Sequence, residues 1–149
     1  MLAGPGAKGQ LPKEVTQLKV DCTANVLFFL HTFNTSGQWR PAKPTDSGPV
    51  VLKYVVHYAD GQKAEIPVRL HDGIDHWIVR NPAGLRNAAV AWSARFPGDS
   101  SEEEAVVYQF SWINPHPEQV IQSIDMSYGP EGEKFGAPVL LAVTAGVTP

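Results

Sequence analysis

Apolar and polar residues alternate with a period of two along much of the chain, the pattern of β-strands that bury one face. The clearest alternation spans residues 50–59. Its apolar face carries Val50, Leu52, Tyr54, Val56 and Tyr58. Lys53 and His57 occupy the opposite face. Residues 25–33 are apolar on both faces instead, which predicts a central strand that is covered on both sides.

Turn residues separate the alternating segments. Asp60-Gly61 follows the strand predicted at 50–59, and an Asp-Gly pair predicts a tight hairpin in which both central residues take positive φ. The return strand, 63–69, contains Pro67, which has no N–H to donate and therefore predicts an edge strand or a bulge. Further strands are predicted at 17–20, 88–95, 105–113, 120–128 and 139–145.

This pattern predicts an all-β fold, an antiparallel β-sandwich or jelly roll of about eight strands. Residues 70–87 are expected to form a polar and aromatic connection, and no segment shows a helical period. We expect one domain over residues 16–149, preceded by a flexible leader or linker remnant at 1–15 that lacks the features of a signal peptide.

Composition narrows the function classes. The 149 residues include 13 Gly and 13 Pro, which suits many short strands and loops better than long helices. The net charge of −3, with 12 thinly spread basic residues, gives no footprint for nucleic acid, and no apolar run has the length of a membrane span. Cys22 is the single cysteine, so no internal disulfide forms, and we expect it to be a buried small apolar residue.

Residues 71–77, HDGIDHW, form the densest cluster of reactive side chains. Two imidazoles and two carboxylates could ligate a metal or act in acid–base chemistry, but the alternative is a solvated turn anchored by its tryptophan. No zinc motif, G-x-S-x-G elbow or phosphate-binding glycine loop is present in the sequence. We therefore assign no catalytic residue and expect the chain not to be an enzyme, and leave the metal ligands open.

Two loop tryptophans are the candidate ligand-binding residues, because sugar rings stack on exposed aromatic faces while polar neighbours bind their hydroxyls. Trp39 lies beside Gln38 and Arg40, and Trp77 lies near Asp75, His76 and Asn81. A loop tryptophan could equally fold down as a lid on the core. Trp92 and Trp112 fall within predicted strands and are expected in the core.

Three segments resemble a known kind of module: residues 27–33 (LFFLHTF), 54–61 (YVVHYADG) with 66–68 (IPV), and 114–117 (NPHP) with 121–125. Across about residues 11–145 the chain is similar to the accessory β-sandwich domains, galactose-binding-like or of carbohydrate-binding-module type, of bacterial secreted glycoside hydrolases and related multidomain proteins. The resemblance implies an extracellular or periplasmic location and a non-catalytic role beside a catalytic domain, in the same polypeptide or a partner subunit. It also implies a candidate structural calcium ion, to which Asp60, Asp72 and Asp75 could contribute, although no cofactor is certain.

The sequence thus favours a non-catalytic module that binds a polysaccharide or oligosaccharide through loop aromatics. Two alternatives stay open. One is a structural or protein-interaction β-sandwich without a glycan ligand. The other is a small glycan-active enzyme that uses His71, His76 and nearby acids.

Overall fold

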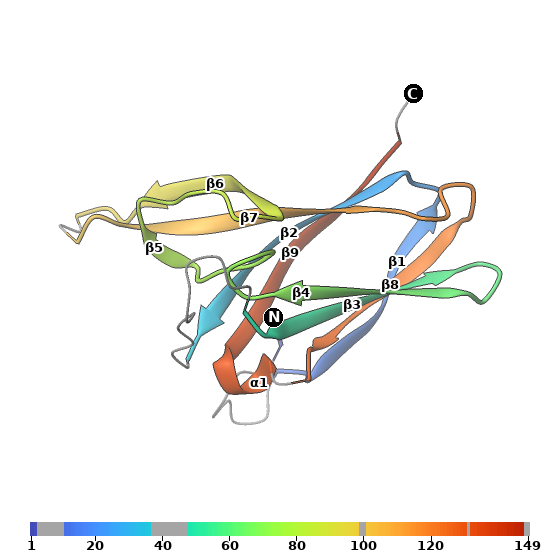
Figure 1. Ribbon diagram of the computed structural model, residues 1–149, viewed down its shortest axis with the longest axis horizontal. Helices are drawn as coiled ribbons and strands as arrows, with labels where there is room; N and C mark the ends of the chain where they lie inside the picture. The colour runs from blue at the N-terminus through green and yellow to red at the C-terminus, as the bar shows by residue number, and fades with distance from the viewer. Residues whose placement is uncertain (3–10, 37–47, 99–100, 131, 148–149) are drawn as a thin grey trace.

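A computed structural model describes residues 1–2, 11–36, 48–98, 101–130 and 132–147, and these form an antiparallel β-sandwich (Figure 1). The strands are β1 Glu14–Cys22, β2 Val26–Thr35, β3 Val50–Tyr58, β4 Lys63–Arg69, β5 Ile78–Arg80, β6 Ala88–Arg95, β7 Glu103–Ile113, β8 Ile121–Tyr128 and β9 Gly136–Gly146. One short helix, α1 Gly132–Phe135, precedes β9. The predicted all-β class is confirmed, and each predicted strand corresponds to an observed one.

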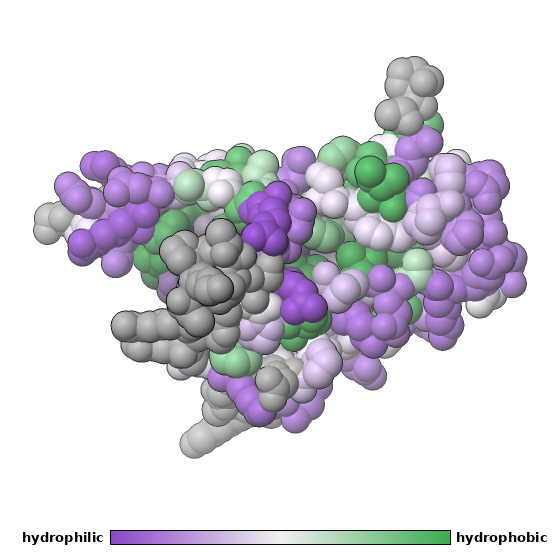
Figure 2. Space-filling view, in the orientation of Figure 1, coloured by the Kyte–Doolittle hydropathy of each residue, from purple (hydrophilic) through white to green (hydrophobic). Residues whose placement is uncertain are grey.

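The two sheets are interleaved in sequence. The four-stranded sheet has the order β1-β8-β3-β4. In the other sheet β7 pairs with β6 on one edge and with β2 and β5 on the other, and β2 also pairs with β9. The β5, β6 and β7 end of this sheet projects at the left of Figure 1, beyond the overlap with the four-stranded sheet. Hydrophilic side chains gather at both ends of the long axis, and hydrophobic patches lie between them (Figure 2).

The main core lies between the sheets, where β2, β3, β4 and β8 direct largely apolar side chains inward. Phe29 of β2 stacks on Tyr54 of β3 across the interface, with ring centroids 4.2 Å apart. Leu2 is fully buried in the same cluster, and its N–H donates to the carbonyl of Pro138 in β9. Beneath β6 and β7 lies a smaller cluster around Val106 and Tyr108.

The predicted hairpin at Asp60-Gly61 is present, but its turn differs from the expected one. Of the pair Asp60-Gly61, only Gly61 has positive φ, at 88°. The N–H of Gly61 donates to the carbonyl of Tyr58, which closes a β-turn over residues 58–61. The N–H of Tyr58 then donates to the carbonyl of Gln62. This is a longer loop with a left-handed glycine instead of a two-residue turn. The prediction that both central residues take positive φ was wrong. β4, with its Pro67, is an edge strand as predicted.

The edge strand β1 is irregular. Register shifts against β8 fall between Val15 and Leu18 and between Lys19 and Cys22. Gln17 and Asp21 lie within these shifts and have φ of 58° and 50°. The N–H of Gln17 donates to Oδ1 of Asp125 at 2.8 Å, and Oδ2 of Asp125 lies 2.6 Å from Nε2 of His57. One carboxylate therefore ties the irregular edge to the centre of the sheet.

Three further expectations need correction. The connection at 70–87 contains strand β5, which is only three residues long and gives too short a pattern to detect. Cys22 is partly exposed instead of buried. Trp92 is 54% exposed instead of in the core, whereas Trp112 packs partly buried against the core. In the part of the chain described here, no helix has the length and apolarity required to cross a membrane.

Candidate ligand-binding site

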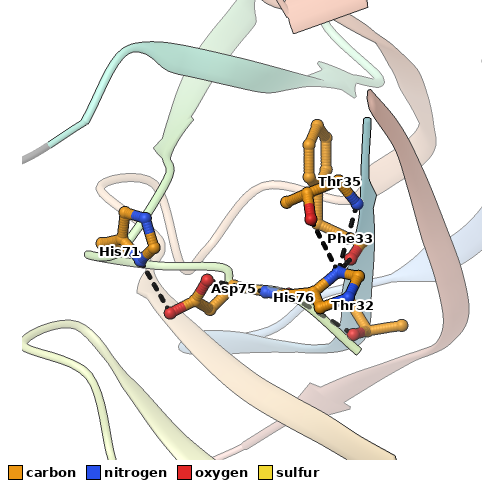
Figure 3. A network of polar contacts seen from close by, with 6 residues as sticks. All are labelled: Thr32, Phe33, Thr35, His71, Asp75 and His76. Carbon is orange, nitrogen blue, oxygen red and sulfur yellow. Dashed lines mark hydrogen bonds and ion pairs between the residues drawn. The ribbon is translucent and has the colours of Figure 1, made fainter. Parts of the chain in front are cut away.

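The loop between β4 and β5, residues 70–77, carries the predicted cluster of histidines and acids (Figure 3). Asp75 uses both carboxylate oxygens within this loop. Its Oδ2 lies 2.8 Å from Nδ1 of His71, and its Oδ1 accepts a 2.7 Å hydrogen bond from the backbone N–H of His76. The carboxylate therefore fixes the turn, and its contact to His76 is with the backbone and not with the ring.

The ring of His76 contacts the end of β2. Its Nδ1 accepts a hydrogen bond from the N–H of Thr35 at 3.2 Å and lies 2.9 Å from Oγ1 of the same residue. The carbonyl of Phe33 is also 3.2 Å from Nδ1, and the N–H of Phe33 donates to the carbonyl of Asp75. Side chain and backbone together dock the loop onto β2 (Figure 3).

Asp72, 8% exposed, connects the same loop to residues 84–89, which lead into β6. Its Oδ2 accepts a 2.7 Å hydrogen bond from Nδ2 of Asn87, and its backbone carbonyl accepts from the N–H of Asn87 at 2.9 Å. Nε of Arg86 lies 3.8 Å from its other carboxylate oxygen. A buried carboxylate with these partners holds residues 84–89 in place.

His31, fully buried on β2, supports the loop from below. Its Nε2 is 2.8 Å from the carbonyl of Gly73, which can only accept, so Nε2 carries the proton. Its Nδ1 therefore accepts from the hydroxyl of Tyr54, 3.0 Å away in the opposite sheet. Burial lowers the pKa of His31 to about 4, despite the opposing hydrogen bond to Gly73, and burial also raises the pKa of Tyr54. His31 is therefore a hydrogen-bonded core histidine.

The structure brings three of the predicted ligand-binding residues together, namely Asp75, His76 and Trp77. Trp77 is half-buried, with its ring edge-to-face against Phe96 at 6.1 Å and against His76 at 6.4 Å. Asn81 is exposed just beyond the end of β5, with φ of 51°. Gln38, Trp39 and Arg40 lie outside the described residues. A ligand at these positions stays a prediction.

The acids named for calcium hold separate partners. Asp60, at the tip of the β3–β4 hairpin, accepts from the N–H and the amide of Gln62, at 2.9 and 2.8 Å. Asp72 and Asp75 have the partners given above, at the other end of β4. Among the residues that the structure describes, no group of three or more His, Cys, Asp or Glu side chains could hold a metal ion.

Trp92 is expected in the core because it falls within a predicted strand, and strict alternation would place it on the inward face with Ala88 and Val90. A register shift between Val90 and Trp92 inserts one extra residue into β6 and reverses the alternation. Trp92 consequently pairs with Val107, which alternates with the buried Val106 and Tyr108 and so faces outward. Only a signal for the bulge could have revealed this, and the sequence of β6 contains no glycine that marks one.

The residues around Trp92 form an uncharged outward sheet surface, which we call the Trp92 face. Gln109 lies in its centre, paired with Ala89 on one side and Leu30 on the other. The complete set is Ala89, Trp92, Val107, Gln109, Ser111, Phe28, Leu30, Ala142 and Thr144. No member carries a charge, so the face combines apolar surface with amide and hydroxyl groups.

An open hollow of about 440 Å³ adjoins this face. Gln109 and Ser111 of β7 form one side, and residues 84–89 form the other. Because side chains two residues apart on a strand share a face, Gln109 lies next to Val107 and hence close to the ring of Trp92. The hollow is therefore continuous with the Trp92 face.

Comparisons with protein-family models, with curated proteins and with solved structures found no match to this chain.

Proposed function

We propose that this domain is a non-catalytic carbohydrate-binding module, and that a polysaccharide or oligosaccharide binds on the Trp92 face. The observation that carries the proposal is the 54% exposed indole of Trp92 on an uncharged sheet surface beside an open hollow. An aromatic ring held on a rigid strand offers a flat apolar platform, which suits the C–H face of a sugar ring.

The polar groups next to Trp92 support the same ligand class. The amide of Gln109 can both donate and accept, as can the hydroxyl of Ser111, so the pair can bind sugar hydroxyls of either orientation. Arg86, with its side chain 60% exposed, lies at the rim of the hollow. The face itself lacks charged groups, so we propose a glycan that is neutral where it contacts the sheet.

The experiment is affinity electrophoresis of the purified domain in gels that contain soluble polysaccharides, with pull-down on insoluble ones, each with and without calcium. We expect retardation by one polysaccharide class. For that class, Trp92→Ala should weaken binding by about tenfold or more, because a central aromatic anchor is lost. Trp92→Tyr should retain much of the binding, since it keeps a ring at the same position.

Val120→Ala is the matched control, because Val120 is 41% exposed and lies in the connection to β8, away from the Trp92 face. Its binding should equal that of the wild type. Trp77→Ala tests the loop position predicted from the sequence: loss of binding there, with Trp92→Ala unaffected, would move the site to the loop. Circular dichroism and thermal melting of each variant separate binding loss from unfolding.

A protein-interaction domain is the second candidate function. The observation that favours it is the exposure of large apolar residues other than Trp92, with Ile113 at 81% and Leu141 at 58%. Failure of every polysaccharide to retard the wild-type domain would favour this alternative.

A further inference from the structure

Phe28 is a second aromatic residue on the Trp92 face. It lies on β2 between Leu27 and Phe29, which are both fully buried. Because successive side chains of a strand point to opposite faces, Phe28 points to the outward side of the sheet, where it is partly exposed. Its partner on β7 is Ser111. The face therefore carries aromatic side chains on β6 and on β2, with β7 between them.

A glycine on β9 leaves the space into which the ring of Phe28 extends. A Cβ added at Gly146 would lie 2.9 Å from Cε2 of Phe28 and 2.8 Å from Cγ1 of Val26. Both distances are shorter than the separation at which carbon atoms make favourable contact. The ring of Phe28 therefore reaches over the backbone of β9, and aromatic surface is present at both ends of the face.

The strand pairing places the two aromatic residues at opposite ends of a diagonal across the sheet. Trp92 pairs with Val107 of β7, and Phe28 pairs with Ser111, which lies further along the same strand. Strands about 4.8 Å apart and a rise of about 3.3 Å per residue put the Cα atoms of Trp92 and Phe28 about 16 Å apart. A single sugar ring is much smaller than this distance, so one sugar cannot contact both aromatic rings.

Gln109 lies at the midpoint of this diagonal. On β7 it is equally far from Val107, the partner of Trp92, and from Ser111, the partner of Phe28. All three β7 side chains share the outward face, because they alternate along the strand. The amide of Gln109 can both donate and accept hydrogen bonds, so it can bind the hydroxyls of a sugar that lies between the two aromatic rings.

We infer that the ligand is an extended, linear, neutral glycan, of which one sugar stacks on Trp92 and another, several units along the same chain, stacks on Phe28. This inference rests on the proposed function and adds the length and the direction of the bound segment, which crosses β6, β7 and β2 diagonally. A β-1,4-linked chain is straight enough to follow such a diagonal, whereas a helical chain curves away from the sheet. Once the first sugar is bound, the second contact forms at a high effective concentration.

Isothermal titration calorimetry with β-1,4-linked oligosaccharides of two, four and six sugars, from the glucan, mannan and xylan series, tests the inference. In a series that binds, we expect the hexasaccharide to bind about tenfold tighter than the disaccharide or more, because only the longer chain reaches both rings. Equal affinities for the two lengths overturn the inference and leave the proposed function intact. Retardation by a polysaccharide without binding of any of the three series does the same. Failure to bind any polysaccharide overturns both.

Phe28→Leu tests the second aromatic contact, because it removes the ring but keeps an apolar side chain. It should lower the affinity for the hexasaccharide to near that for the disaccharide and leave the disaccharide affinity unchanged. Phe28→Tyr, the matched control, keeps a ring and should keep the dependence on chain length. A Phe28→Leu variant that binds the hexasaccharide as tightly as the wild type overturns the inference. If thermal melting shows that Phe28→Leu does not fold, the length dependence of the wild type decides the outcome.

Discussion

At the residue scale, His31 connects three parts of the fold. It is neutral, fully buried and bonded on both ring nitrogens, and it joins β2 to Tyr54 in the other sheet and to the loop at Gly73. An imidazolium here would have to donate from Nδ1 as well, inside an aromatic environment that includes Phe110 at 5.9 Å. Protonation of His31 therefore competes with folding.

This predicts a pH dependence of stability in a defined window. His31 takes up a proton with a pKa of 6.5 in the unfolded chain and about 4 in the folded protein. Its contribution is fully present above pH 6.5 and is lost as the pH falls towards 4, by about 3 kcal/mol in the free energy of unfolding. Urea denaturation at several pH values measures it.

His31→Gln is the variant that isolates this effect, because an amide can still donate to Gly73 and accept from Tyr54 but does not titrate. We expect lower stability at pH 7 and a shallower loss between pH 6.5 and 4. If the free energy of unfolding of His31→Gln fell with pH as steeply as that of the wild type, other groups would cause the pH dependence.

Residue patterns on regular strands could be predicted from the sequence, and those at irregular positions could not. The inward face of β3 and the buried His31 follow from alternation and from burial on a central strand. The exposure of Trp92 does not follow from alternation, because one inserted residue inverts every following position in a strand. The contact of Asp72 with Asn87 also depends on tertiary structure that spacing does not encode.

At the element scale, the start of β9 depends on a glycine. Gly136 has φ of 147°, and a Cβ at this position would collide with the carbonyl oxygen of Asn34 on β2. Gly61, in the β3–β4 turn, has φ of 88° but no atom within 4 Å of such a Cβ. A side chain at Gly61 would therefore add backbone strain alone, whereas one at Gly136 would add both backbone strain and a steric collision.

We expect Gly61→Ala to lower the free energy of unfolding by about 1–2 kcal/mol, the cost of a left-handed alanine. Gly136→Ala should cost clearly more, because backbone atoms of β2 must move as well. Chemical denaturation of both variants compares them directly. Equal losses would show that β2 and β9 yield to the extra atom without strain.

The irregular edge of β1 depends on Asp125. Partial burial acts to raise the pKa of this carboxyl, but the hydrogen bonds from Gln17 and His57, with the positive charges of His57 and Lys63, outweigh it and hold the pKa below 3.8. The resulting stabilisation is present above pH 3.8 and is lost as the pH falls through the lower folded-state value. The pH range over which Asp125 affects stability therefore lies below the range for His31.

Asp125→Ala should therefore loosen β1 more than the rest of the sandwich. We expect faster amide exchange at Gln17 and its neighbours in β1, with little change in β7, measured at neutral pH. Asp125→Asn, which keeps an acceptor for the N–H of Gln17, should restore much of the protection. Uniformly faster exchange across both sheets would contradict a local role.

At the scale of the whole molecule, the sandwich could be predicted because the residues that determine it recur along the whole chain. Turn residues at regular spacing and strands with one apolar face leave few arrangements other than two packed sheets. The strand order could not be predicted, since it depends on which strands pair across long sequence separations, such as β1 with β8. The candidate site could not be predicted for the same reason, because the Trp92 face combines β2, the consecutive strands β6 and β7, and β9, which come from three separate parts of the chain.

The anchoring of residues 84–89 to Asp72 has a consequence for binding kinetics. The wall of the hollow is held by the carboxylate and backbone of Asp72 before any ligand arrives, so little conformational entropy remains to be lost there. Association at this surface should then be a single step whose observed rate rises linearly with ligand concentration, without the plateau that a slow loop closure imposes.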